Sequence, residues 1–281
     1  MIKIIFAIIF SQSIAWCGSD AIYGEDNRKD VYAETNPLWV ELSLSTAALI
    51  EKKNIQINGD EATISATPLG EMYRLCPSER FRQQPTAANC SGTLIAPNLI
   101  LTAAHCYDLP KNICNDYVWV FDYKTIKSTD SFVKVGVEKI YGCKAIVQKE
   151  MNLSQGIDQA LIRLERTVGD RKSARLNSQG NIQMNDPLVL IGHPSGLPTK
   201  IAGGANILKI LNNSFLSNVD AFSVNSGSGV FHALSGEYLG ILSSGRQDYD
   251  GKGNCTSSLI YPMDQGNETV IIPKDIEKFL K

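Results

Sequence analysis

The chain has 281 residues, of which 43% are hydrophobic and 20% are charged, and its formal net charge is −2. This composition is ordinary for a packed globular protein and excludes a disordered or collagen-like chain. The nearly neutral charge balance provides no basic face, so we expect no nucleic-acid partner. At roughly 150 residues per domain, the length allows two domains or one large all-β unit.

The N-terminus has the three parts of an export signal. Lys3 supplies the positive charge, residues 4–10 are apolar, and residues 13–15 form a small-x-small cleavage site. A second cleavage site follows Cys17, and cleavage there leaves an even number of cysteines, as an oxidising compartment favours. We therefore place the signal at residues 1–17; a short buried strand is the alternative for this segment. No later run approaches the ~18 apolar residues of a membrane span, so we expect a secreted or periplasmic protein without membrane contact after signal removal.

Short β-branched or aromatic runs dominate the rest of the chain, with Gly, Asn, Asp and Pro between them. The predicted strands are residues 117–121, 132–137, 160–164, 188–191, 238–242 and 269–272. Many short strands at such spacing favour an all-β sandwich or barrel. Helices are predicted at residues 44–52 and, after Pro273, at residues 274–281.

A polar stretch divides the predicted strands into two groups. Residues 166–186 contain few apolar residues in sequence and are interpreted as a linker between two β halves. The chain is thus expected to consist of the signal, an N-terminal unit at residues 18–165, this linker, and a C-terminal unit at residues 187–281.

One segment carries residue types typical of a catalytic site. The sequence CSGTLI at residues 90–95 is followed by LTAAHC at residues 101–106, which contains His105. A zinc site would need further ligands at suitable spacing, but the other histidines, His193 and His232, are isolated among apolar residues and glycines. We therefore expect no metal ion.

Two further blocks agree with this segment. In DQALIRL, residues 158–164, an aspartate opens an apolar strand, and residues 225–231 read NSGSGVF. The three blocks, in the order His, Asp, Ser, resemble the motifs of trypsin-like (chymotrypsin-fold, S1-type) serine proteases, in particular bacterial glutamyl-endopeptidase-like members. The resemblance runs from about residue 21 to the end. It implies an all-β fold of two antiparallel six-stranded β-barrels of the chymotrypsin type with a short C-terminal helix, and an active site between the barrels.

The resemblance implies a catalytic triad of His105, Asp158 and Ser226, and the chemistry supports these roles. A serine hydroxyl is a weak nucleophile at neutral pH and needs a base such as His105 within hydrogen-bond reach. The imidazole in turn needs a buried acceptor, Asp158, that fixes its tautomer and stabilises the imidazolium. The backbone N–H groups of Ser226 and Val224 would form the oxyanion hole. In isolation, Ser226 would read as part of a surface turn.

Two residues depart from the family pattern. Val224 stands where the family usually has glycine, and a positive φ there would strain a β-branched residue and distort the oxyanion hole. Asn225 replaces the aspartate that pairs with a newly cut N-terminal amine in vertebrate relatives. An ion-pair activation switch is therefore not expected.

The resemblance also places substrate-binding residues in the second barrel. Ser243 matches the hydroxyl that supports the catalytic aspartate, and Ser244 and Gly245 continue the strand that pairs with the substrate backbone. Asp220 matches the carboxylate at the floor of the primary pocket in trypsin. We rank a basic P1 residue first, a small or apolar one second and an acidic one last. A structural role for Asp220 is the alternative.

The family's local disulfide corresponds to Cys90 and Cys106, which we expect to be paired. The other four cysteines allow three pairings, and the sequence does not choose among them; Cys114 with Cys143 is preferred because both border the same predicted strand pair.

These features predict a monomeric serine endopeptidase that acts on protein or peptide substrates without a cofactor. Two alternatives stay open: a latent or inactive protease-like binding protein, for which Val224 is the argument, and an esterase that uses the same triad.

Overall fold

The computed structural model describes residues 21–108, 112–177, 180–251 and 253–280. The predicted export signal at residues 1–17 lies outside these residues. Within the described ranges, no helix is long and apolar enough to cross a membrane.

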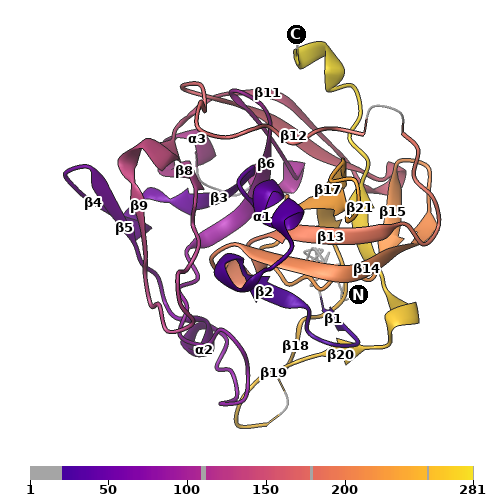
Figure 1. The fold of residues 1–281 in the computed structure, drawn as a ribbon, viewed down its shortest axis with the longest axis horizontal. Helices are drawn as coiled ribbons and strands as arrows, with labels where there is room; N and C mark the ends of the chain where they lie inside the picture. The colour runs from indigo at the N-terminus through magenta and orange to yellow at the C-terminus, as the bar shows by residue number, and fades with distance from the viewer. Residues whose placement is uncertain (1–20, 109–111, 178–179, 252, 281) are drawn as a thin grey trace, which may run out of the picture.

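Strands form two large sheets that lie next to each other (Figure 1). The first sheet has the order β10 (Ile140–Tyr141), β8 (Tyr117–Phe121), β3 (Thr46–Glu51), β6 (Ala88–Ala96), β7 (Leu99–Thr102), β12 (Ile157–Leu164) and β11 (Cys143–Asn152). The second has the order β13 (Pro187–Gly192), β16 (Gly229–His232), β17 (Tyr238–Ser244), β21 (Glu268–Ile271), β15 (Ser214–Ser217), β14 (Lys200–Ile210) and β2 (Arg28–Asp30). An additional pairing of β13 with β14 closes six strands of the second sheet into a barrel. The first sheet forms a half-barrel, and the predicted all-β, chymotrypsin-like class is confirmed.

Smaller elements decorate these sheets. The short strands are β4 (Ile55–Asn58), β5 (Glu61–Ile64) and β9 (Val133–Gly136) in one sheet, β18 (Tyr249–Asp250) with β19 (Ser257–Ser258), and β1 (Ile22–Tyr23) with β20 (Ile260–Tyr261). The α-helices are α1 (Pro37–Ser43), α2 (Leu69–Met72) and α3 (Ile113–Asp116). The 3-10 turns include η3 (Ala104–Tyr107), η5 (Leu153–Gln155), η6 (Pro194–Gly196), η7 (Met263–Gln265) and η8 (Glu277–Phe279), with η1 (Val31–Ala33), η2 (Lys52–Asn54) and η4 (Val137–Lys139) elsewhere.

The helix predicted at residues 44–52 is wrong. The chain leaves α1 at Ser43 and forms strand β3 from Thr46 to Glu51, which pairs with β6 on one side and β8 on the other. Five of its six residues are buried. Although Ala, Leu and Glu favour helices, a central position in the sheet buries this segment more completely than one helix face would, so tertiary packing overrides local propensity.

The C-terminal helix is shorter than predicted. It is the single 3-10 turn η8, and Asp275 just before it has a left-handed φ of 55°, which a regular helix beginning at residue 274 cannot contain.

The N-terminal segment crosses to the second sheet. β2 pairs with β14, and β1 pairs with β20 (Figure 1). Residues 22–30, which the sequence assigned to the N-terminal unit, therefore lie against the C-terminal one.

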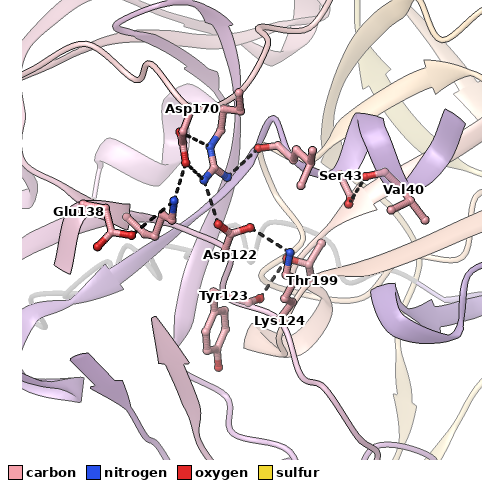
Figure 2. A network of polar contacts seen from close by, with 11 residues as sticks. Val40, Ser43, Asp122, Tyr123, Lys124, Glu138, Asp170 and Thr199 are labelled. Carbon is pink, nitrogen blue, oxygen red and sulfur yellow. Dashed lines mark hydrogen bonds and ion pairs between the residues drawn. The ribbon is translucent and has the colours of Figure 1, made fainter. Parts of the chain in front are cut away.

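Polar contacts also hold the segment between the two sheets in place. In the network of Figure 2, Asp122 and Asp170 point toward the same guanidinium, that of Arg171, at 2.9 and 2.7 Å. Arg171 also donates to the carbonyl of Leu44, and its side chain is almost fully buried. The predicted linker is thereby fixed onto the first sheet.

Candidate active site

His105 and Asp158 come together because the strands that carry them are neighbours. His105 lies in η3, directly after β7, and Asp158 lies near the start of β12, which pairs with β7 in the register Ala160 to Thr102. This register brings the two residues together at the same end of the strand pair.

The Asp158 carboxylate accepts three hydrogen bonds. Its Oδ2 lies 2.6 Å from His105 Nδ1 and accepts from Ser243 Oγ at 2.6 Å, and its Oδ1 accepts from the backbone N–H of His105 at 3.0 Å. Asp158 is fully buried, whereas about a fifth of the His105 side chain is exposed. Because Ser243 is on β17 of the second sheet, this carboxylate bridges the two sheets.

The electrostatics of the pair suit an ionised aspartate. Burial alone would raise the pKa of Asp158, but the hydrogen bond and charge of His105 outweigh it and hold this pKa below its ordinary value. With Nδ1 of His105 held by the carboxylate, the Nε2 atom is the one available to take up a proton.

Ser226 is placed beside this pair by its backbone. Its carbonyl accepts from the N–H of Ser91 at 2.8 Å. The same carbonyl oxygen lies 3.8 Å from the Sγ of Cys106, which is the residue directly after His105. The next residue, Gly227, donates to the Leu242 carbonyl at 2.8 Å. Among the described residues, no hydrogen bond joins the Ser226 hydroxyl to His105.

The backbone conformation and the surroundings of residue 227 require glycine. Its φ is +86°, and a Cβ atom there would lie 2.0 Å from the Ser91 carbonyl oxygen. Residues 222–228 form the loop that carries Ser226, called the serine loop, and only glycine at position 227 fits between this loop and β6.

Val224 adopts the left-handed conformation that the sequence analysis considered, with φ of 74°. The N–H of Asn225 donates to the Phe222 carbonyl at 3.0 Å, which closes a tight turn around Val224. Asn225 is buried, and its side-chain oxygen accepts from Ser228 Oγ at 2.6 Å.

Asp220 contacts the N-terminal segment. One carboxylate oxygen accepts from the N–H of Tyr23 at 2.8 Å, and the other accepts from the N–H of Asn27 at 2.7 Å. Next to these bonds, Ala221 donates to the Ala21 carbonyl. Burial raises the pKa of Asp220 to about 6. These contacts favour the structural alternative over the pocket-floor role.

Ser243 and Ser244 face a groove between the two sheets. The groove has a volume of about 860 Å³ and is lined on one side by residues 153–157 and on the other by residues 211–214. Gly245 follows directly after β17. The residues implied to bind the substrate backbone thus continue the strand that supports Asp158, whereas Asp220 lies with the N-terminal segment.

Three disulfides are present in the described residues. Cys90 is bonded to Cys106 beside His105, Cys114 to Cys143, and Cys76 to Cys255 across 179 positions. The first two are the pairs favoured from the sequence, and the third joins two cysteines whose pairing the sequence left open.

Sequence reasoning missed two residues that hold the serine loop. Asp248 accepts two hydrogen bonds from Ser223, and Ser195 donates its N–H to the Ser223 carbonyl. No local pattern marks either residue, because both contacts join segments that are far apart in sequence.

A chymotrypsin-like pair of sheets, with a buried aspartate and a histidine at their boundary and a serine loop beside them, defines a serine-protease class of hydrolase. The sequence matches the family described as "Trypsin-like peptidase domain" over residues 90–241. It is also 32% identical over 146 residues to chymotrypsin-like elastase family member 1 of Macaca fascicularis. The match spans half of this chain and half the length of that relative.

Two solved structures resemble the fold. Kallikrein-related peptidase 10 has a TM-score of 0.50 and 15% identity over 85% of this chain and 94% of its own. A Glu endopeptidase in complex with MPD has a TM-score of 0.50 and 16% identity over 92% of this chain and 97% of its own. The chain belongs to the trypsin-like peptidase family, and its fold is that of a chymotrypsin-like serine protease.

Proposed function

We propose that this chain is a serine endopeptidase that hydrolyses peptide bonds through a Ser226–His105–Asp158 triad. The observation that carries the proposal is the buried Asp158 carboxylate, which holds His105 by Nδ1 at 2.6 Å and by its backbone N–H. This contact leaves Nε2 as the base for a serine from the adjoining loop.

In the proposed mechanism, Ser226 Oγ attacks the scissile carbonyl while its proton passes to His105 Nε2. Asp158 stabilises the imidazolium, and the N–H groups of Val224 and Ser226 donate to the developing oxyanion. His105 then returns the proton to the leaving amine, and the acyl-enzyme forms on Ser226. A water molecule, deprotonated by the same imidazole, hydrolyses the acyl-enzyme.

The substrate is proposed to be an extended protein or peptide segment. Its backbone would pair with Ser244 at the end of β17 and with Gly245 after it, and its residues before the scissile bond would occupy the groove next to Ser243 and Ser244. Because Asp220 already accepts two backbone hydrogen bonds, we expect it to act on the N-terminal segment rather than on a basic P1 side chain.

The protein is proposed to act as a monomer outside the cytoplasm, in the secreted or periplasmic space. Three disulfides are typical of an oxidising compartment. All proposed catalytic groups belong to one chain. N-terminal sequencing of the exported protein tests the proposed signal at residues 1–17.

Labelling with a fluorophosphonate tests the function directly. We expect rapid labelling of the wild-type protein and none of Ser226→Ala, together with cleavage of casein. Absence of labelling would point to the latent binding protein, and labelling with hydrolysis of short-chain esters but not of casein would point to the esterase.

A further inference from the structure

The main chain at Ser223, directly before Val224, is held by hydrogen bonds from two sides. The Ser223 carbonyl accepts from the N–H of Ser195 at 2.6 Å. On the other side, Ser223 donates from its N–H at 3.0 Å and from Oγ at 2.5 Å to the same oxygen of Asp248, which is buried. The main chain at residue 223 is therefore fixed just before the proposed oxyanion donor.

These contacts determine the direction of the Val224 N–H. In a trans peptide, the C=O group and the following N–H point in opposite directions, and the described residues contain no cis peptide bond. Since the Ser223 carbonyl points to Ser195, the Val224 N–H points away from it. The bond from the Asn225 N–H to Phe222 closes a four-residue turn with φ of 74° at Val224, which is the signature of a type II turn.

Valine is a poor residue for this position. The third residue of a type II turn is normally glycine, because a Cβ, and above all a branched one, disfavours positive φ. A valine without support would relax to negative φ, and the peptide plane before it would rotate. The strained conformation persists only where surrounding contacts over-determine it.

Tyr249, the neighbour of Asp248, contacts Ser195, which is the residue that donates to the Ser223 carbonyl. Its hydroxyl lies 2.9 Å from Ser195 Oγ, and its ring packs against Phe222 with centroids 5.1 Å apart. Ser195 itself has a left-handed φ of 53°. Asp248 thus holds Ser223, and Tyr249 holds Ser195, which are the two residues joined by this backbone hydrogen bond.

A disulfide bond also fixes the hairpin that contains Tyr249. Tyr249 and Asp250 form β18, which pairs with β19, and the connection between them contains Cys255, disulfide-bonded to Cys76. The support for the serine loop is therefore itself anchored to a distant part of the chain.

We propose that Asp248 and Tyr249 are positioning residues that hold the Ser223–Val224 peptide in the orientation in which the Val224 N–H donates to the oxyanion. Through these contacts, valine keeps the positive φ that the glycine usual in the family would adopt without support. The inference rests on the proposed function, because it assigns Val224 to the oxyanion hole.

The decisive variants are Asp248→Ala, Val224→Gly and the double variant, assayed with a fluorogenic peptide. Asp248→Ala is expected to lower kcat about 10- to 100-fold with less than about threefold change in KM, because one oxyanion donor is worth about 10²–10³ in kcat. Val224→Gly should restore about tenfold of the kcat that is lost in the Asp248→Ala background, since glycine keeps positive φ without support. A tripeptide boronic acid, which mimics the tetrahedral intermediate, should lose affinity in parallel with kcat.

Asp264→Asn is the matched control, because Asp264 is an exposed carboxylate of the same half without a described contact to residues 220–226. If Asp248→Ala does not fold, Tyr249→Phe provides the same comparison with a smaller loss of kcat. A normal kcat in these variants, or a loss that Val224→Gly does not restore, would overturn the proposed positioning role while fluorophosphonate labelling of wild-type Ser226 still upholds the function. A wild-type protein that is not labelled overturns both.

Discussion

The variant Asp220→Asn distinguishes between two roles of this buried carboxylate: a structural contact with the N-terminal segment and recognition of a basic P1 side chain. Burial, with a smaller contribution from the nearby Asp26 charge, raises the pKa of Asp220 to about 6, even though Arg28 and two backbone N–H groups act in the opposite direction. The difference from the ordinary value of 3.8 corresponds to about 3 kcal/mol. The asparagine variant removes this titration and keeps one acceptor oxygen.

The sign of the pH dependence follows from the raised pKa. Between pH 4 and pH 6 the folded protein binds more protons at Asp220 than the unfolded chain, so this residue's contribution to the unfolding free energy falls as the pH rises. We expect the wild-type protein to gain about 2 kcal/mol relative to Asp220→Asn on going from pH 7 to pH 4, because the full difference is reached only below the unfolded pKa of 3.8.

Urea unfolding at several pH values measures this difference, with Asp264→Asn as a control for the loss of one negative charge. A pH-independent difference, or one of opposite sign, would refute the reasoning from burial. A parallel P1 scan tests the pocket role: we expect the same P1 profile for both proteins, and a selective loss of Arg and Lys substrates in the variant would place Asp220 in the pocket.

Three further substitutions test the site. Ser226→Ala should lower kcat by about 10⁴–10⁶-fold with an unchanged unfolding transition, and retained proteolysis would exclude it as the nucleophile. Ser243→Ala should lower kcat/KM about tenfold, since it removes a hydrogen bond to the charged Asp158; an unchanged rate would show that the bond is dispensable. Gly227→Ala should destabilise the protein by more than about 3 kcal/mol in thermal unfolding, because its Cβ would meet a backbone oxygen at 2.0 Å. Gly251→Ala, which meets nothing within 4 Å, should not, and equal effects would contradict this steric account.

Local sequence patterns located several of the observed strands, and the histidine and aspartate that they singled out lie in contact. His105 and Asp158 stand in short blocks whose strands pair directly, so motif and fold carry the same information. The pattern failed at residues 46–51, where helix-favouring residues form a central strand because neighbours on both sides bury them.

Long-range contacts account for what the sequence could not show. The hydrogen bond between Asp220 and Tyr23 joins residues that are 197 positions apart. Asp248 accepts from Ser223, which stands 25 positions earlier, and no sequence motif marks this contact. An acidic residue six positions before a serine looks the same whether it faces a substrate or a distant backbone N–H. Burial and partners distinguish these cases, and both become visible only in the folded structure.

The pairing of β1 with β20 and of β2 with β14 affects how the protein folds during synthesis. β1 and β2 are synthesised well before their partners β20 and β14. Until then these segments have no ladder to join, and an unpaired strand edge can associate with other chains. The second barrel also contains β21, so it can close only after residues 268–271 have emerged, and shorter translation products would expose unpaired strand edges that favour aggregation.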